Sequence, residues 1–391
     1  MVARYAGRHV PASPLDLLAR SAELPHGAER VGLCEEAAEK ADALGNLELG
    51  YLAREKLVEA AIFAGHPEKA LVAFAWLLGR ADDDPERFPE QDLLWYYKWV
   101  AAELPDFAEV TLERIRSVYA DMERRYVRCG YSLRPVHKLR WLEARARGER
   151  EEARAHFERF RVSPRDAGAD CFACELDDEV LFLVDQGRDA EAVDRAAPIL
   201  SGEAACASVP AVTWATLLLP LVRLGRREEA VEIQRRGYPQ VVGRRHFVRV
   251  AADHLEFLSL AGEAERATAA FLHGLPLALE TSNQDDRFRF LRAACVYART
   301  AAPAVARLPS LPPRSGAPRS SADARCAREA LFAWLHEVAV ELAGRFDARN
   351  GSDAYARRLA GSLARAADPS QFLSSSQDPD GAGPDPAPRV V

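Results

Sequence analysis

One short motif recurs along most of this 391-residue chain: a glycine followed five residues later by an alanine, with charged residues between them. The glycines of its five copies are Gly65, Gly148, Gly187, Gly225 and Gly262. The last four are 39, 38 and 37 residues apart, and the first interval, 83 residues, is about twice that period. A fixed spacing of this size is typical of repeat proteins. We therefore expect one further, degenerate copy within the first interval.

Apolar residues on both sides of these glycines follow helical spacing. Before Gly225, one helix face carries Trp214, Leu217, Leu218, Leu221 and Leu224. After Gly65, one face carries Ala70, Leu71, Phe74 and Leu77. These patterns predict helical hairpins, in which the glycine ends the first helix and the alanine lets the second approach closely. Since neither helix can bury its apolar face alone, successive hairpins must stack.

Over about residues 45–280 the repeats resemble the tetratricopeptide repeat (TPR) superfamily. Three copies carry an aromatic residue at that family's second-helix position, namely Phe74, Phe157 and Phe271. Two copies depart from the pattern with Ala196 and Gln234, and the period is nearer to 38 than to about 34 residues. The resemblance implies an all-α fold: a TPR-like α-α solenoid of about six helical hairpins with C-terminal capping helices.

The same patterns predict how the chain is divided. The expected segments are an N-terminal arm (1–25), a TPR-like helical repeat domain (26–302), a linker rich in proline and serine (303–325), C-terminal helices (326–367) and a disordered tail (368–391). The expected hairpins are 47–80, 90–129, 133–161, 172–200, 209–238 and 245–280. The second of these is the degenerate copy.

Composition excludes several classes of protein. A net charge of −7 argues against a nucleic-acid binder, which needs a positive surface for phosphates. The longest apolar run, Val209–Val222, is too short to cross a membrane and is interrupted by two prolines. The first residues lack the continuous apolar run of a signal peptide. Seven scattered cysteines do not indicate a disulfide framework. We therefore expect a cytoplasmic protein with no membrane partner.

The most specific local motif is Cys171-Phe-Ala-Cys174, which Cys206 follows 32 residues later. In the repeat frame these cysteines lie on the same edge of two neighbouring hairpins, so they are placed to meet. Two thiolates at the Cys171–Cys174 spacing can bind one tetrahedral metal ion, with zinc as the first candidate cofactor and Cys206 as a further ligand. No fourth ligand is obvious, although Cys129, His137 and His246 occupy nearby repeat positions. The alternatives are a redox or disulfide pair and three plain reduced thiols.

A second set of residues suggests a recognition surface. The first helices of the hairpins would line a concave groove, and exposed polar or aromatic side chains on them are candidate peptide contacts. These candidates are Tyr96, Tyr97, Lys98, Arg134 and Lys138. The alternative interpretation is that the aromatic residues form core and that the basic residues pair with nearby carboxylates.

No enzyme motif is present: the chain lacks a phosphate-binding glycine loop, a zinc-protease motif, a nucleophile elbow and a dinucleotide fingerprint. We therefore expect a scaffold without catalytic activity that binds a protein or peptide partner. The second hypothesis is a metal- or thiol-dependent sensor that uses Cys171, Cys174 and Cys206.

Overall fold

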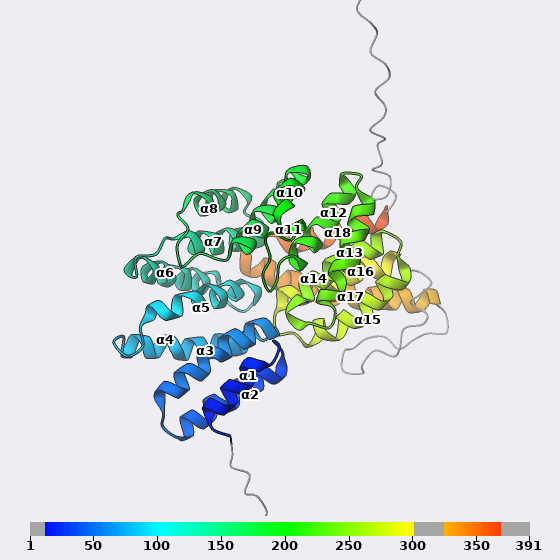
Figure 1. Ribbon diagram of the computed structural model, residues 1–391. Coiled ribbons are helices and arrows are strands. Elements are labelled where there is room, and N and C mark those ends of the chain that lie inside the picture. The colour runs from blue at the N-terminus through cyan, green and yellow to red at the C-terminus, as the bar shows by residue number, and fades with distance from the viewer. Residues whose placement is uncertain (1–11, 301–323, 369–391) are drawn as a thin grey trace, which may run out of the picture.

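The computed structural model describes residues 12–300 and 324–368, and within these ranges every regular element is a helix (Figure 1). The first part contains α1 (Pro14–Glu23), α2 (Ala28–Ala43), α3 (Leu47–Ala64), α4 (Pro67–Asp83), α5 (Glu90–Glu103), η1 (Leu104–Asp106), α6 (Leu112–Arg128), α7 (Arg134–Arg147) and α8 (Arg150–Val162). The rest contains α9 (Phe172–Asp185), α10 (Asp189–Arg195), α11 (Ala197–Leu200), α12 (Ala211–Arg223), α13 (Arg227–Val241), η2 (Arg245–Phe247), α14 (Val248–Leu260), α15 (Ala264–Glu280), α16 (Gln284–Thr300), α17 (Ala324–Asn350) and α18 (Ala354–Ala367). The prediction of an all-α fold is confirmed.

The helices lie close to their predicted positions. The six expected hairpins correspond to α3–α4, α5–α6, α7–α8, α9 with α10–α11, α12–α13 and α14–α15. The arm expected over residues 1–25 is helical over residues 14–23, because Ser13 and Asp16 form a capping box that begins α1. Three other predicted segments lie almost wholly outside the described residues. They are the rest of the arm, the linker 303–325 and the tail 368–391, which fall on residues 1–11, 301–323 and 369–391.

The motif glycines end the first helices of the hairpins as predicted. Gly65 and Gly148 take the left-handed conformation, with φ of 74° and 83°, and their amide groups bond back into α3 and α7. A distant segment of the chain also packs closely against each of these two glycines. A Cβ atom at Gly65 would lie 2.8 Å from the backbone nitrogen of His246, and one at Gly148 would lie 2.9 Å from the Cβ of Ala354. These turns are therefore contact points between distant parts of the chain.

Among the described residues, the apolar core contains two large clusters and three smaller ones, one of which lies between the two large clusters. The first cluster is built from α1–α7, and the second extends from α9 to α18. The cluster between them joins α7, α8 and α9 through Trp141, Phe157 and Phe182, in which the two phenylalanine rings stack at 3.6 Å between centroids. The stack of helices is therefore continuous from one large cluster to the other.

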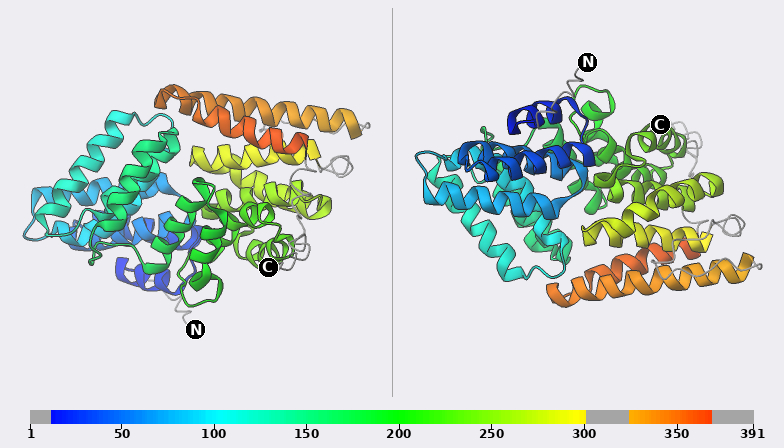
Figure 2. Two further views of the ribbon diagram at one scale, coloured as in Figure 1. Left: turned by 90° about the horizontal axis from the view of Figure 1, so that it is seen from above. Right: turned by 90° about the horizontal axis from the view of Figure 1, so that it is seen from below.

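The two ends of the helical array also meet. Helix α16 contacts η1, α3 contacts η2, and α18 contacts α7. Figure 2 shows α17 and α18 side by side along α16. Arg349, at the C-terminal end of α17, donates from Nη1 to the carbonyl oxygens of Pro105 and Phe107, each at 2.8 Å. The C-terminal helices thus contact both halves of the array rather than only its end.

We expect Gly65→Ala to destabilise the protein more than Gly187→Ala does. Both glycines have positive φ, so each alanine incurs backbone strain of about 1–2 kcal/mol. Only at Gly65 would the new methyl group meet a backbone segment, since no atom lies within 4 Å of a Cβ at Gly187. Overpacking should add about 1–3 kcal/mol to the loss.

Urea unfolding of the two variants measures this difference. Equal losses in the free energy of unfolding would show that the close approach of η2 to α3 contributes nothing to stability.

Candidate functional site

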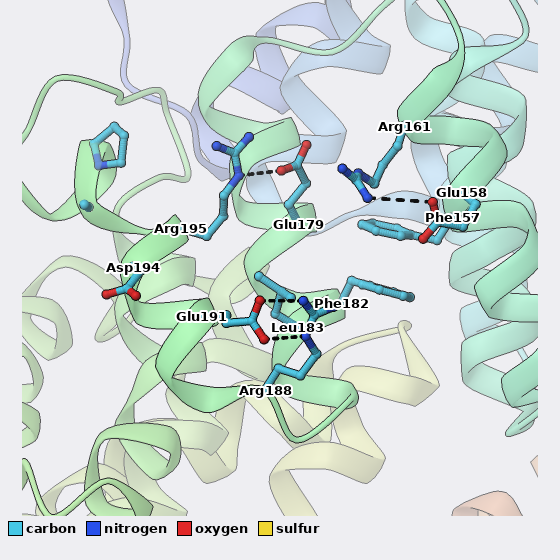
Figure 3. Close-up of a pocket in the computed structure, with 12 residues that line it drawn as sticks. Phe157, Glu158, Arg161, Glu179, Phe182, Leu183, Arg188, Glu191, Asp194 and Arg195 are labelled. Carbon is cyan, nitrogen blue, oxygen red and sulfur yellow. Dashed lines mark hydrogen bonds and ion pairs between the residues drawn. The ribbon is translucent and has the colours of Figure 1, made fainter.

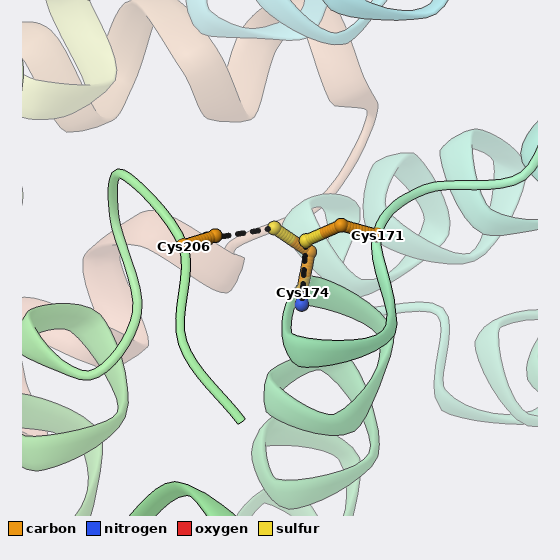
Figure 4. Close-up of side chains that lie close together, drawn as sticks. All are labelled: Cys171, Cys174 and Cys206. Atoms are coloured by element: carbon orange, nitrogen blue, oxygen red, sulfur yellow. Dashed lines mark hydrogen bonds between the residues drawn. The ribbon is translucent and has the colours of Figure 1, made fainter. Parts of the chain in front are cut away.

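Three cysteine side chains converge at the start of α9 (Figure 4). Cys171 is the N-cap residue of this helix, Cys174 lies in its first turn, and Cys206 lies in the loop between α11 and α12. The Sγ atoms of Cys174 and Cys206 are 3.4 Å apart, and all three sulfurs lie within 4.8 Å of one another. The predicted meeting of these residues across neighbouring hairpins is confirmed.

Local backbone structure explains how the sulfurs face one another. The extended backbone of Cys171 allows its Sγ to accept a hydrogen bond from the amide of Cys174 at 3.3 Å, as an N-cap side chain does. This brings the two sulfurs to one side of the helix end. In the opposing loop, Cys206 donates its amide to the carbonyl of Val209, and its Sγ accepts from the amide of Val209 at 3.4 Å. This tight turn holds the Cys206 sulfur toward α9.

Hydrogen bonds shift the pKa values of Cys174 and Cys206 in opposite directions. The hydrogen bond with Cys174 and those from the amides of Ser208 and Val209 lower the pKa of Cys206, against the opposing effect of burial. The pKa of Cys174 is raised, first by its hydrogen bond to Cys206 and then by burial. These hydrogen bonds favour the ionised form of Cys206, and thiolates are the form of cysteine that binds metals.

The cluster is open to solvent and suited to a metal ion. Cys171 and Cys206 are exposed, and Cys174 is half-buried. Three thiolates around a zinc ion at about 2.3 Å would have sulfurs roughly 3.8 Å apart, so only small movements separate this arrangement from a coordinated one. No fourth histidine, cysteine or carboxylate among the described residues joins the group. A bound ion would therefore keep one position for water or another ligand.

A network of buried charges holds the segment that leads into Cys171. Asp170 accepts from Lys98 and Lys138, each at 2.9 Å, and Lys98 also donates to the carbonyls of Gly168 and Ala169. Burial disfavours ionisation of Asp170, but the two ammonium groups outweigh it and hold the pKa of this carboxyl well below its usual range. The position of Cys171 is thus fixed by ion pairs with α5 and α7.

Two further carboxylates lie on the next turn of α9. Asp178 forms an ion pair with Lys138, with Oδ2 and Nζ 2.7 Å apart, and burial, only partly offset by that lysine, raises its pKa to about 7. Asp177 accepts from the hydroxyl of Thr213 in α12 at 2.6 Å, and burial raises its pKa to about 6. The Asp177–Thr213 hydrogen bond links the two hairpins that carry the cysteines.

The other ligands considered from the sequence lie elsewhere. Cys129 contacts a carboxylate oxygen of Glu90 at 3.6 Å. The ring of His137 stacks on that of His156, with centroids 6.1 Å apart, and His246 packs against Phe247. Repeat position alone therefore identified the three cysteines but no fourth donor.

The expected exposure of the peptide-contact residues is wrong for three of the five. Tyr97, Lys98 and Arg134 are buried, while Tyr96 and Lys138 are partly buried. Tyr97 donates to Asp121 at 2.8 Å, and Tyr96 packs edge-on against Trp99. The physical reason is that carboxylates from other elements neutralise Lys98 and Arg134 and accept a hydrogen bond from the hydroxyl of Tyr97, a pairing that the sequence alone does not specify.

Arg134 illustrates this role. It forms two parallel hydrogen bonds to Glu175 of α9, each at 2.9 Å, and both side chains are buried. Its Nη1 also donates to the carbonyls of Phe160 and Ser163 at the end of α8. A residue that we expected to contact a peptide instead joins three helices.

Sequence reasoning missed an open cleft of about 840 Å³ beside α8–α11 (Figure 3). Its apolar lining includes Phe157, Phe182 and Leu183. Paired charges surround these side chains, including Arg188 with Glu191 and Arg195 with Glu179. The only available signal was the shortness of the helix that follows Gly187: α10 has 7 residues, whereas α13 and α15 have 15 and 17.

Sequence reasoning also missed a buried acidic cluster where the array closes. Asp106 of η1 and Asp286 of α16 both pair with Arg249 of α14. Burial and the charge of Asp106 raise the pKa of the neighbouring Glu103. Asn283 donates to Glu103 and Asp106, which lie about 180 residues away in the sequence. No local pattern could have indicated this contact.

Comparisons with known proteins give no assignment. No protein-family model matches the chain, and no curated protein shows significant sequence similarity to it. Among the described helices, none combines the length and hydrophobicity needed to span a bilayer. The geometry of the site is therefore the basis for proposing a function.

We expect Arg134→Met to lower the free energy of unfolding by about 3 kcal/mol, since it removes one of the two guanidinium groups that pair with buried Glu175 and leaves the carbonyls of Phe160 and Ser163 without this donor. Arg124→Met is the matched control, because Arg124 pairs with Asp121 on an exposed face of α6 and should contribute less than about 1 kcal/mol. Urea titration followed by circular dichroism measures both losses. Similar values would mean that the buried pair does not hold α7, α8 and α9 together.

Proposed function

We propose that this protein is a non-catalytic helical scaffold whose state is set by a metal ion bound at Cys171, Cys174 and Cys206. The convergence of three sulfurs within 4.8 Å carries this proposal. Random surface thiols have no reason to meet, whereas here two consecutive hairpins each contribute to one cluster. An ion at this position would connect the start of α9 with the loop before α12.

Zinc is the ion that the site supports best. Soft thiolate ligands favour zinc and copper(I) over the hard cations, and zinc accepts three protein ligands with an open fourth position. Loss of the ion would leave three sulfurs on two separate segments, so the connection between the hairpins would loosen. This makes the site suitable for sensing as well as for structural support.

The architecture that we propose around this site is a TPR-like α-α solenoid. Its support is the recurring turn: Gly65, Gly148, Gly187, Gly225 and Gly262 all have positive φ between paired helices. In this proposal the stack curves until α16–α18 contact both halves, as the bonds from Arg349 to the segment around η1 indicate. In this proposal the repeat motifs are degenerate because several helices also contact distant parts of the chain, as α18 contacts α7, which a regular array does not require.

A second candidate function is recognition of a peptide from a protein partner, and the cleft beside α8–α11 favours it. The cleft combines an aromatic lining with charges of both signs, which suits a segment with an apolar side chain flanked by charged ones. It replaces the predicted contacts on α5 and α7, several of which are buried. Nucleic acid and membranes remain outside the proposal.

We expect the purified protein to bind about one zinc ion per chain. Cys206→Ser should weaken binding by at least roughly 10–100-fold, because it removes a ligand rather than an outer contact. Cys129→Ser is the matched control, since this half-exposed thiol lies outside the cluster. Elemental analysis gives the stoichiometry, and competition with a chromophoric chelator gives the affinity. Less than about 0.2 equivalents of metal, with all thiols freely titratable, would rule out the metal site.

For the second candidate, we expect Arg188→Ala to weaken capture of amphipathic peptides on an array by several-fold. Arg226→Ala provides the control, because Arg226 pairs with Glu229 at the equivalent place in the next hairpin and does not line the cleft. Fluorescence anisotropy with the captured peptides would measure both affinities. Absence of any captured peptide, or equal effects of the two variants, would contradict recognition at this cleft.

A further inference from the structure

The spacing of Cys174 and Cys206 allows a reaction besides metal binding. Their sulfurs are 3.4 Å apart, and a disulfide bond requires about 2.05 Å, so an approach of roughly 1.4 Å would join them. Cys171 is less suitable as a partner, because its sulfur caps the helix by accepting the amide of Cys174. The geometry therefore selects one pair among the three cysteines.

The loop that carries Cys206 is the segment able to make this movement. Cys174 is held in the first turn of α9, whereas Cys206 lies outside regular structure between α11 and α12. Ala205 and Ala207, on either side of Cys206, are exposed. The buried side chains of Ala204 and Val209 hold the two ends of this loop segment in the core. The tip can shift toward α9 while these anchors stay in the core.

We propose that a peroxide oxidant closes a Cys174–Cys206 disulfide and that this reaction ejects the metal ion, so that the site is gated by redox state. This inference rests on the proposed metal-binding function, whose regulation it describes. Cys206 is the sulfur that attacks the oxidant, because it is the more exposed member of the close pair, and Cys174 is the resolving sulfur because it is nearest.

The reaction balances with hydrogen peroxide as the two-electron oxidant. The Cys206 thiolate attacks one peroxide oxygen, so an S–O bond forms, the O–O bond breaks, and the leaving hydroxide takes up a proton to become water. The Cys174 thiolate then attacks the sulfenic sulfur, so the S–S bond forms and the S–O bond breaks, and the second hydroxide also leaves as water. Two thiolates, one peroxide molecule and two protons yield one disulfide and two water molecules.

Metal release follows from the loss of ligands. A disulfide sulfur carries no charge and is a poor ligand, so the reaction removes two of the three donors and leaves only Cys171. One exposed thiolate cannot hold the ion against water. Reduction of the disulfide by a cellular dithiol would restore the site, which makes the switch reversible.

The same loop connects the switch to the contact between the two ends of the array. Ser208, two residues beyond Cys206, lines a cavity of about 170 Å³ together with Phe63, Glu103 and Asn283. These residues belong to α3, α5 and the segment before α16. A shift of the loop tip therefore reaches the place where the first and last parts of the helical array meet.

The test uses the 391-residue chain loaded with zinc and treated with a small excess of hydrogen peroxide. A chromophoric chelator reports free zinc, and peptide mapping by mass spectrometry identifies disulfides. We expect one zinc ion released for each two thiols lost, a single Cys174–Cys206 link, and recovery of zinc binding after treatment with dithiothreitol. Cys129→Ser should release zinc at the same rate as the unmodified protein.

Metal-free protein separates this inference from the proposed function. If the protein binds no zinc but peroxide still joins Cys174 to Cys206, the metal function fails and the reactive pair stands. If zinc binds and peroxide yields a different disulfide, a sulfinic acid or no release, the redox gate is overturned while metal binding stands.

Cys174→Ser provides a further check in the metal-free protein. Without its resolving partner, Cys206 should accumulate as a sulfenic acid that dimedone traps, with at least a ten-fold larger yield than in the unmodified chain. Equal trapping in the two proteins would contradict the assigned roles.

Discussion

The structure depends on one constraint: each helix has an apolar face that it cannot bury without a neighbour on either side. The hairpins therefore stack, and the core is distributed along the array in two large clusters that the rings of Trp141, Phe157 and Phe182 connect. Because stacking places equivalent positions of successive hairpins next to each other, it also brings the start of α9 to the loop before α12. The cysteine cluster is a consequence of that register.

Buried ion pairs add specificity to this otherwise non-directional packing. Asp170 with two lysines and Arg134 with Glu175 connect α5, α7, α8 and α9 around the segment that carries the cysteines. Such pairs contribute little net stability compared with well-packed apolar groups, but an unpaired member is costly, so they penalise any alternative register. We infer that the charges hold the cysteine cluster in place while the apolar faces provide most of the stabilisation.

The candidate site was partly accessible from the sequence. Cys171, Cys174 and Cys206 could be placed together because the repeat period assigns them to one edge of adjacent hairpins, and the structure confirms the meeting. The groove residues could not be judged in this way. Burial of Tyr97, Lys98 and Arg134 depends on carboxylates at Asp121, Asp170 and Glu175, which come from other elements. A sequence pattern shows that a side chain is charged but does not show which opposite charge will cover it.

By itself, the sequence determined the helices, their order and most of their ends, because these follow from local periodicity, capping residues and glycines that must adopt positive φ. The tertiary structure alone decided how the array closes. Arg249 pairs with Asp106, and Gly65 lies against the backbone of His246, across separations of more than 140 residues. Contacts of this kind depend on the combined packing of all the helices between the two residues. No local sequence pattern encodes this combined packing, which is established only when every hairpin packs against its neighbours.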